Sequence, residues 1–335
     1  MLLRRAILPT VRPTLLCALW WAASAGAVAA TPPVLSVDLL TKGMHADSSE
    51  GKSYKTCPYQ YFGYRAVEWL DAQQILVAFS TTPHCATKEG ILTGKVRLVT
   101  FSLDGRPLHS TDLPYDAGEG LGVRMIQHDG VWIGPGRSVI VEVPGSRLKA
   151  QPNSRDKVVV LSSELSSEQE IDTDSHEAYY DGIHFAGVTG DHQAVLFWTS
   201  DGVIGHARSC LVFNGKPLKQ MGTCLPQDLE SLDPTADYKF SVLLPKNYQV
   251  RAFAGRSMHG ERISLFAVKE GGFLGACDIV AKFCPSDGEL IVFDTNTNRP
   301  VLRRRLPLSG RAALSPTGKH LAVMENNRLE VFPLP

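Results

Sequence analysis

The chain has 335 residues, of which 44% are hydrophobic and 20% are charged, and it contains 29 glycines and 21 prolines. This composition is typical of a globular protein and excludes a disordered, collagen-like or coiled-coil chain. The 34 basic residues balance the 34 acidic residues, so no overall electric field would hold nucleic acid, and we expect no nucleic-acid partner.

Residues 1–30 have the pattern of a secretory signal peptide. Three arginines come first, an apolar stretch runs from Leu15 to Ala23, and small residues end at Ala29 and Ala30. The apolar stretch is shorter than the roughly 20 residues that cross a bilayer, although an uncleaved anchor is the alternative. We therefore expect residues 31–335 to be one exported domain, periplasmic or extracellular, with no membrane span. Its net charge would be about −3, because the signal removes three arginines and no acidic residue.

Five short apolar segments follow, and each comes after a polar turn. Their starts are roughly 60 residues apart, slightly long for a structural repeat of the known periods. In chain order they are residues 75–79, 139–141, 194–198, 263–266 and 321–324. A second apolar segment follows each of them, at residues 96–103, 158–162, 210–213, 290–294 and 329–332. Short apolar runs bounded by turn residues predict β-strands.

Three of the second segments end in the same way, with a phenylalanine, a turn containing Gly or Asn, a basic residue and a proline. The pairs are Phe101 and Pro107, Phe213 and Pro217, and Phe293 and Pro300. Four short antiparallel strands, repeated with such turns, are the pattern of a β-propeller blade. We predict an all-β propeller of about five four-stranded blades. A sixth blade is possible in residues 227–248, which we interpret instead as an insertion.

The last unit contains the turn Ser315-Pro316-Thr317-Gly318-Lys319. It resembles the Ser-Pro-Asp-Gly-Lys turn of the WD40-like repeats in exported bacterial propellers such as the TolB C-terminal domain. Thr317 departs from that pattern, where aspartate is usual, and only this unit keeps the motif. The resemblance implies a propeller, whereas the fold itself serves many unrelated functions.

Six of the seven cysteines lie beyond the predicted signal peptide. They are Cys57, Cys85, Cys210, Cys224, Cys277 and Cys284. An even number in an exported chain predicts disulfides, and their order suggests the local pairs 57 with 85, 210 with 224, and 277 with 284. Sequence alone leaves 15 connectivities open. A metal site is the alternative, but no pair has the spacing of a zinc knuckle, and we expect no metal.

The long connections are expected to gather at one end of the blades. If the strands of a blade are named a to d, an antiparallel meander places the a–b and c–d connections at one end and the others at the opposite end. We predict short b–c and d–a turns, such as 104–106 and 315–319, and long a–b and c–d connections. The long segments are 42–63, 80–95, 173–182, 223–249 and 269–287. Because the cysteines lie in or beside them, this end is the predicted binding face, unless the bridges only protect long insertions.

The densest polar cluster is expected within one a–b connection, residues 172–184. His176, Asp181 and His184 are the candidates there for general acid and base chemistry. No ordered ligand or catalytic spacing supports this site, and polar residues gather in loops anyway. His84 beside Cys85 suggests a nucleophile that disulfide pairing would remove.

The remaining features have structural interpretations. Arg303 to Arg305 are predicted on the first strand of the last blade, with side chains that alternate between faces and are solvated or paired. Trp132 and Trp198 are predicted to pack within blades. We therefore expect a monomeric binding module for an unknown protein, glycan or small molecule, without a cofactor. The alternatives are a hydrolase or lyase that uses His176, Asp181 and His184, and an envelope-assembly component.

Overall fold

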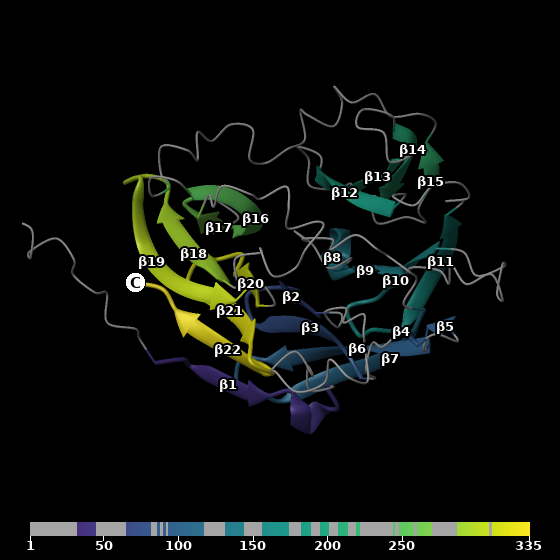
Figure 1. The fold of residues 1–335 in the computed structure, drawn as a ribbon, viewed down its shortest axis with the longest axis horizontal. Coiled ribbons are helices and arrows are strands. Elements are labelled where there is room, and N and C mark those ends of the chain that lie inside the picture. Colours follow the sequence, from purple (N-terminus) through teal and green to yellow (C-terminus); the bar gives the residue numbers. More distant parts are fainter. Residues whose placement is uncertain are drawn as a thin grey trace, which may run out of the picture. The chain divides into compact units, whose positions relative to one another are not determined.

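Each of the ten predicted apolar segments lies on a strand in a computed structural model of the chain (Figure 1). The structure describes residues 32–44, 65–81, 86–87, 90–91, 93–116, 131–143, 156–173, 182–188, 195–200, 207–213, 219–221, 244, 248–257, 260–269, 287–307 and 310–335. The predicted signal peptide and the 227–248 insertion lie almost wholly outside these ranges. All that follows concerns the unit Pro33–Pro335.

The strands form five four-stranded antiparallel sheets, numbered here in chain order, and one small hairpin. The first sheet contains β2 (Arg65–Trp69), β3 (Gln74–Ser80), β6 (Thr93–Ser102) and β7 (Pro107–Asp116). The second contains β8 (Val131–Ile133), β9 (Val139–Val143), β10 (Asp156–Leu161) and β11 (Ser167–Thr173). The third contains β12 (Gly182–Val188), β13 (Val195–Ser200), β14 (Ala207–Phe213) and β15 (Lys219–Met221). The hairpin, β4 (Ala86–Thr87) with β5 (Gly90–Ile91), lies between β3 and β6 in sequence.

The last two sheets complete the pattern. The fourth sheet contains β16 (Tyr248–Arg256), β17 (Arg262–Lys269), β18 (Asp287–Asp294) and β19 (Arg299–Pro307). The fifth contains β20 (Arg311–Leu314), β21 (His320–Glu325), β22 (Arg328–Pro333) and, as its outermost strand, β1 (Leu35–Asp38). Figure 1 shows β1 in purple beside β22 in yellow, although the two strands come from opposite parts of the sequence. The sequence did not reveal this pairing.

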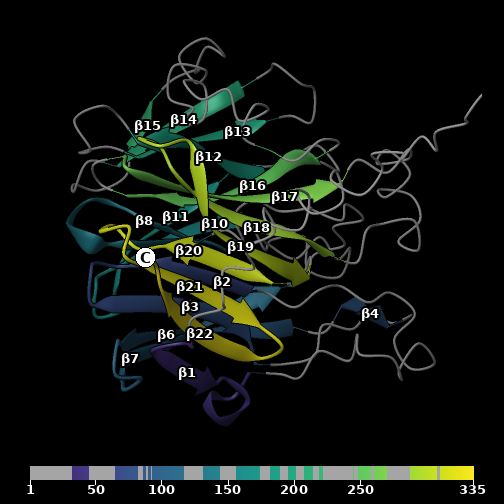
Figure 2. The same cartoon turned by 90° about the vertical axis from the view of Figure 1, so that its left-hand side faces the viewer.

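The first strand of a sheet makes most of the contacts between sheets. β2 contacts both β20 and β8, and β20 contacts β16; Figure 2 shows β2 and β20 next to each other. Repeated four-stranded antiparallel sheets that meet along their first strands are the arrangement of a β-propeller. The fold class is therefore the predicted one, whereas the number of blades in the whole chain stays a prediction.

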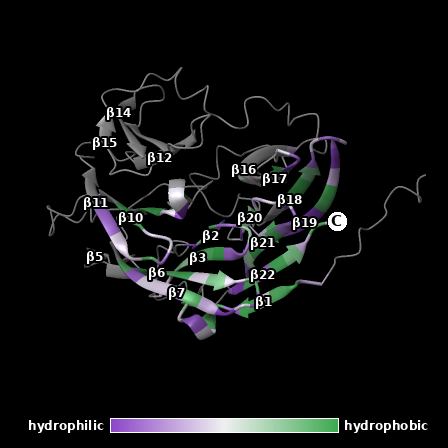
Figure 3. Cartoon of the chain, turned by 180° about the vertical axis from the view of Figure 1, so that it is seen from behind, coloured by the Kyte–Doolittle hydropathy of each residue, from purple (hydrophilic) through white to green (hydrophobic). Residues whose placement is uncertain are grey.

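Apolar clusters fill the spaces between adjacent sheets. One lies between the fifth and first sheets and includes Trp69, Phe79, Phe101 and Val331. Others join the first sheet to the second and the fourth to the fifth. Figure 3 shows hydrophobic colour along β21 and β22 and hydrophilic colour along β11. A blade cannot bury both of its faces alone, so these contacts between sheets are the core of the fold.

The recurrent proline marks the start of an outermost strand. Pro107 begins β7, and Pro300 is the second residue of β19. Proline has no N–H to donate to a ladder and is tolerated at a sheet edge. The predicted hairpin motif therefore identifies the step from the third strand of a sheet to its fourth.

Two sequence predictions about strand order were wrong. Turn 315–319 joins the first and second strands of the fifth sheet, and turn 103–106 joins the third and fourth strands of the first sheet. The a–b and c–d turns are therefore the short ones, so our lettering was displaced by one strand. Likewise, Arg303 to Arg305 lie on β19, the last strand of the fourth sheet. In the described residues no helix is long and apolar enough to cross a membrane.

Candidate functional site

The two ends of the sheets differ in the length of their connections. Turns 70–73, 103–106, 257–261, 295–298 and 315–319 lie at one end, which we call the short-turn end. The strands that are joined by segments 43–64, 81–92, 174–181, 222–247 and 270–286 have those ends on the opposite side, which we call the long-connection end; two short connections, 308–310 and 326–327, are also at this end. With the corrected lettering, the strand ends that these long segments connect are at one end, as predicted, whereas the segments themselves lie largely outside the described residues.

At the short-turn end, two turns have the same internal hydrogen bonds. The backbone N–H of His320 donates to the Ser315 hydroxyl at 3.0 Å, and that of Arg262 donates to the Ser257 hydroxyl at 3.0 Å. Gly318 and Gly260, each three residues after its serine, have a φ of 69°, which glycine adopts without strain. Both turns were predicted from the sequence, but their likeness was not recognised, because the shared signal is a sparse Ser-x-x-Gly.

Side chains at this end also join neighbouring sheets. Arg262 donates to the Gly318 carbonyl at 2.9 Å and to the Pro335 carbonyl, which links the fourth sheet to the fifth. Arg137, in the 3-10 turn η2 (Pro135–Arg137), pairs with Asp71 at 2.7 Å and links the second sheet to the first. The polar groups named here are therefore engaged in holding the scaffold together.

The contact between the first and fifth sheets is aromatic. Trp69, which is 4% exposed, donates its indole N–H to the Ala313 carbonyl at 2.9 Å. Its ring stacks on the His320 imidazole, with centroids 6.2 Å apart. Burial against this surface, with a smaller contribution from the charge of Lys319, lowers the pKa of His320. Packing therefore favours the neutral form of this histidine.

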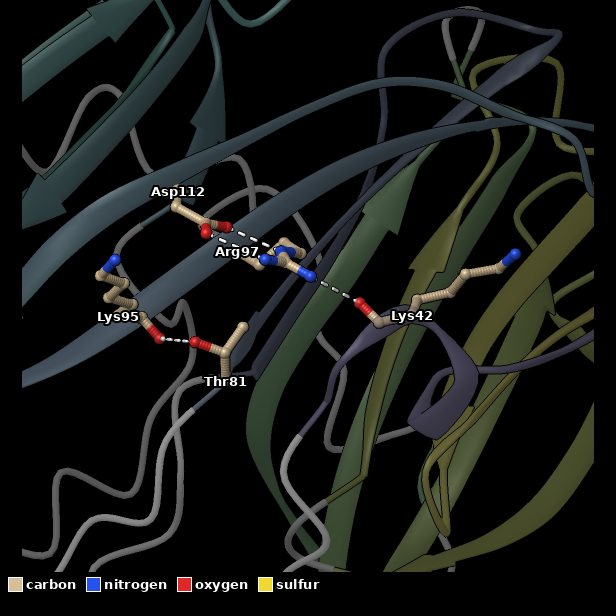
Figure 4. A network of polar contacts seen from close by, with 5 residues as sticks. All are labelled: Lys42, Thr81, Lys95, Arg97 and Asp112. Carbon is tan, nitrogen blue, oxygen red and sulfur yellow. Dashed lines mark hydrogen bonds and ion pairs between the residues drawn. The ribbon is translucent and has the colours of Figure 1, made fainter.

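At the long-connection end, Arg97 on β6 is the best-defined polar centre (Figure 4). Its Nε and Nη2 donate to the two carboxylate oxygens of Asp112 on β7, at 2.7 and 2.9 Å, and its Nη1 donates to the Lys42 carbonyl at 3.0 Å. The hydrogen bond between the two side chains raises the pKa of Arg97 and lowers the pKa of Asp112. Both shifts favour the charged forms, so the ion pair positions Arg97 to bind the turn that contains Lys42.

A second anchor lies two residues away on the same strand. The Thr81 backbone N–H donates to the Lys95 carbonyl at 2.9 Å, and the Thr81 hydroxyl donates to the same oxygen at 3.3 Å; Figure 4 shows this contact beside Arg97. Thr81 follows β3, and Lys42 precedes the segment that leads to β2. The starts of two long connections, 43–64 and 81–92, are thus fixed on neighbouring residues of β6.

The arginine run divides its side chains as the sequence predicted. Arg304 pairs with Glu325 at 2.9 Å and Glu330 at 3.4 Å, and its guanidinium lies 4.5 Å from the centre of the Phe332 ring. Arg303 and Arg305, its neighbours on β19, are exposed. Arg304 therefore joins the fourth sheet to the fifth.

The predicted catalytic residues lie at the edge of what the structure describes. His184 is on β12, opposite Trp198 of β13, and not in a loop. The connection before it, 174–181, joins the second sheet to the third and is therefore a d–a connection, where we had predicted an a–b connection. His176, Asp181 and the side chain of His184 lie outside the described residues, so the structure does not test their convergence.

The predicted disulfides are likewise not tested, because the cysteine side chains lie outside the described residues. Cys210 lies on β14, and its side chain, like the other five cysteines predicted to form disulfides, is outside the described residues. Trp132 and Trp198 lie on β8 and β13, as predicted for strand positions. Within the described ranges, no three His, Cys, Asp or Glu side chains gather closely enough to hold a metal ion.

No protein-family model matches the chain, and no curated protein matches it. Among solved structures it is similar to hydrazine synthase of Kuenenia stuttgartiensis, with 10% identity, a TM-score of 0.25, and coverage of 82% of this chain and 76% of that one. It is similar to the β-propeller domain of the Trilobed protease from Pyrococcus furiosus, with 10% identity, a TM-score of 0.27, and coverage of 78% and 79%.

A third similar structure is a prolyl endopeptidase, with 12% identity and a TM-score of 0.26; the alignment covers 77% of this chain and 30% of that one. The chain thus spans less than a third of that enzyme's length. With TM-scores between 0.25 and 0.27, these likenesses carry no argument about function. The assignment of an all-β propeller fold to this chain comes from its own strand pairing.

Proposed function

We propose that the chain is an exported, monomeric binding module of the WD40-like propeller type, whose ligand binds at the long-connection end. One observation carries this proposal: the starts of connections 43–64 and 81–92 are both fixed on β6, by Arg97 and by Lys95. Long connections on a rigid scaffold are where binding sites in such folds occur. The predicted disulfide between Cys57 and Cys85 would tie these two connections together and restrain them further.

The opposite end supports the proposal by contrast. Its turns are short, and the side chains of Arg262, Arg137 and Trp69 are engaged in contacts between sheets. Groups that hold a scaffold together are poorly placed to exchange their partners for a ligand. The long-connection end is therefore the better candidate for ligand binding.

The two exposed large apolar side chains of the described residues give a matched test, because they lie at opposite ends. Leu40 is 44% exposed beside the long connections, and Val34 is 56% exposed at the short-turn end. In two variants of the full chain, a photoreactive benzophenone amino acid would replace Leu40 or Val34. Each variant would be produced in the organism's own cells, where the natural ligand is present. After irradiation, mass spectrometry of the intact protein would detect an adduct of any chemical class, whether protein, glycan or small molecule.

We expect adducts at position 40 and none at position 34. Adducts at position 34, or none at position 40, would contradict the proposal. The alternative function, a hydrolase or lyase that uses His176, Asp181 and His184, enters the same design. The position-40 variant would also be made with alanine at all three of these residues. If the chain is a binding module, the adduct at position 40 is unchanged by the alanine substitutions. If the chain is an enzyme, the adduct appears only with the alanine substitutions, because the active enzyme converts and releases its ligand.

A further inference from the structure

Residues 34–44 form a small unit of their own, which we call the clasp. It consists of Val34, the strand β1, the 3-10 turn η1 (Leu40–Lys42), Gly43 and Met44. Asp38 accepts a hydrogen bond from the backbone N–H of Leu40, and its carbonyl accepts one from the Thr41 hydroxyl. The N–H groups of Lys42 and Met44 both donate to the Leu39 carbonyl. These bonds are internal, so residues 38–44 keep their shape from local contacts, whereas β1 is ordered by its pairing with β22.

The clasp is attached to two sheets at once. Its strand adds to the fifth sheet through the register Leu35 with Val331 to Asp38 with Arg328. Its apolar side chains enter the cluster between the fifth and first sheets, where Leu35, Val37, Leu39 and Met44 are at most 9% exposed. Its far end is held by Arg97 of the first sheet, through the Lys42 carbonyl. The clasp therefore bridges the seam between the two sheets.

Gly43 fits the clasp onto Arg97. Its φ of 90° is a left-handed conformation that favours glycine. A Cβ atom at this position would lie 2.7 Å from Nη1 of Arg97, the nitrogen that donates to the Lys42 carbonyl. A larger residue would therefore both strain the backbone and displace the guanidinium that holds the clasp.

The clasp is also the part of the fold with the most distant partners in sequence. Arg328 and Ser36, which are hydrogen bonded at 2.8 Å, are 292 residues apart. The other strand pairs of the five described sheets join strands that follow one another along the chain, apart from the β4–β5 hairpin between β3 and β6. Detaching β1 breaks one ladder and leaves β20, β21 and β22 paired with one another. With those strands still paired, detachment frees only residues 34–44 and restores the conformational entropy of that short segment.

From these observations we infer that the clasp opens and closes as one unit while the strands β2 to β22 stay paired in their sheets. Opening uncovers the apolar seam between the fifth and first sheets and releases the start of the 43–64 connection from Arg97. The clasp would thus control how firmly the start of connection 43–64 is held at the long-connection end. Only this last consequence rests on the proposed binding function; the separate opening does not.

Hydrogen exchange of backbone amides, followed by mass spectrometry on the full chain, tests the inference. Amides of residues 35–44 should exchange faster than those of the buried strands β3 and β21, through an opening that depends less on added urea. In the Gly43→Ala variant we expect clasp amides to exchange about tenfold faster, because alanine is strained at this φ, with β3 and β21 unchanged. The matched control is Gly136→Ala: Gly136 has a φ of 69° in the turn before β9, but nothing lies within 4 Å of the added Cβ.

The control variant should leave clasp exchange at the original rate. The inference is overturned if the clasp, β3 and β21 of the unmodified chain exchange through one common opening with the same urea dependence. It is also overturned if Gly43→Ala accelerates all three regions equally. Should that variant fail to fold, the measurement on the unmodified chain still decides, and it needs no ligand, so it is independent of the photocrosslinking result.

Discussion

The short-turn end and the long-connection end of the sheets use polar side chains in different ways. At the short-turn end, Ser315 and Ser257 accept hydrogen bonds within their own turns, and Arg262 joins the turns of two neighbouring sheets. At the long-connection end, Arg97 and Thr81 hold the points where long connections leave the scaffold. One end joins neighbouring sheets, whereas the other holds the starts of two long connections. Under our proposal, stabilisation of the fold and ligand binding are assigned to opposite ends.

The largest test of this division is the substitution Trp69→Ala at the short-turn end. The indole is 4% exposed, bonds to the Ala313 carbonyl and stacks on His320. Its removal leaves a cavity and an unpaired carbonyl, so we expect the free energy of unfolding to fall by about 3–5 kcal/mol. Urea denaturation monitored by far-UV circular dichroism measures this loss.

The control for that substitution lies at the other end. Arg97→Gln removes an ion pair whose two side chains are each 33% exposed, and we expect it to cost about 1 kcal/mol or less. If Arg97→Gln destabilises the chain as much as Trp69→Ala, the two ends do not divide stability in the way we describe.

The sequence predicted those strands whose evidence is local. Residues 75–79 and 321–324 are continuous apolar runs between turns, and a buried strand needs no other signal. β20, with the sequence Arg-Ala-Ala-Leu, is short and has little β-propensity, so it escaped notice. Without it, the turn 315–319 seemed to separate blades, and the order of the strands was displaced by one.

Long-range features escaped for a different reason. β1 is a strand because it pairs with β22, and no local pattern encodes a partner almost 300 residues away. Arg97 is an ordinary strand residue in the sequence, and its role comes from the Lys42 carbonyl, which is 55 residues distant. By contrast, the alternation of Arg303, Arg304 and Arg305 was predictable, because the period of a strand is local.

Two buried serines test whether a hydrogen bond, and not burial alone, stabilises a turn at the short-turn end. Ser315 and Ser264 are both fully buried, but the Ser315 hydroxyl accepts the His320 N–H, whereas the Ser264 hydroxyl has no hydrogen-bond partner. We expect Ser315→Ala to lower the free energy of unfolding by about 1–3 kcal/mol, and Ser264→Ala to raise it by about 1 kcal/mol. Thermal denaturation of the two variants should shift Tm in opposite directions; equal shifts would show that the hydrogen bond is not what stabilises the turn.

The smallest expected effect is the pH dependence of the free energy of unfolding. It distinguishes the two ends because His320 at the short-turn end and Asp112 at the long-connection end titrate in different pH ranges. Burial lowers the pKa of His320 from its ordinary value of 6.5, so the unfolded chain takes up this proton first, and stability falls as the pH drops below about 6.5.

The ion pair with Arg97 lowers the pKa of Asp112 from 3.8. The stabilisation by this pair is therefore present above pH 3.8 and is lost as the pH falls through the lowered pKa. A complete proton difference changes stability by about 1.4 kcal/mol per pH unit, and solvent screening reduces both effects because both side chains are partly exposed. In urea denaturation at a series of pH values, His320→Gln should flatten the curve only below pH 6.5, and Asp112→Asn only in the more acidic range. If His320→Gln leaves the pH dependence of stability just below pH 6.5 unchanged, packing against Trp69 does not favour the neutral imidazole. The pH dependence of the short-turn end would then have another source.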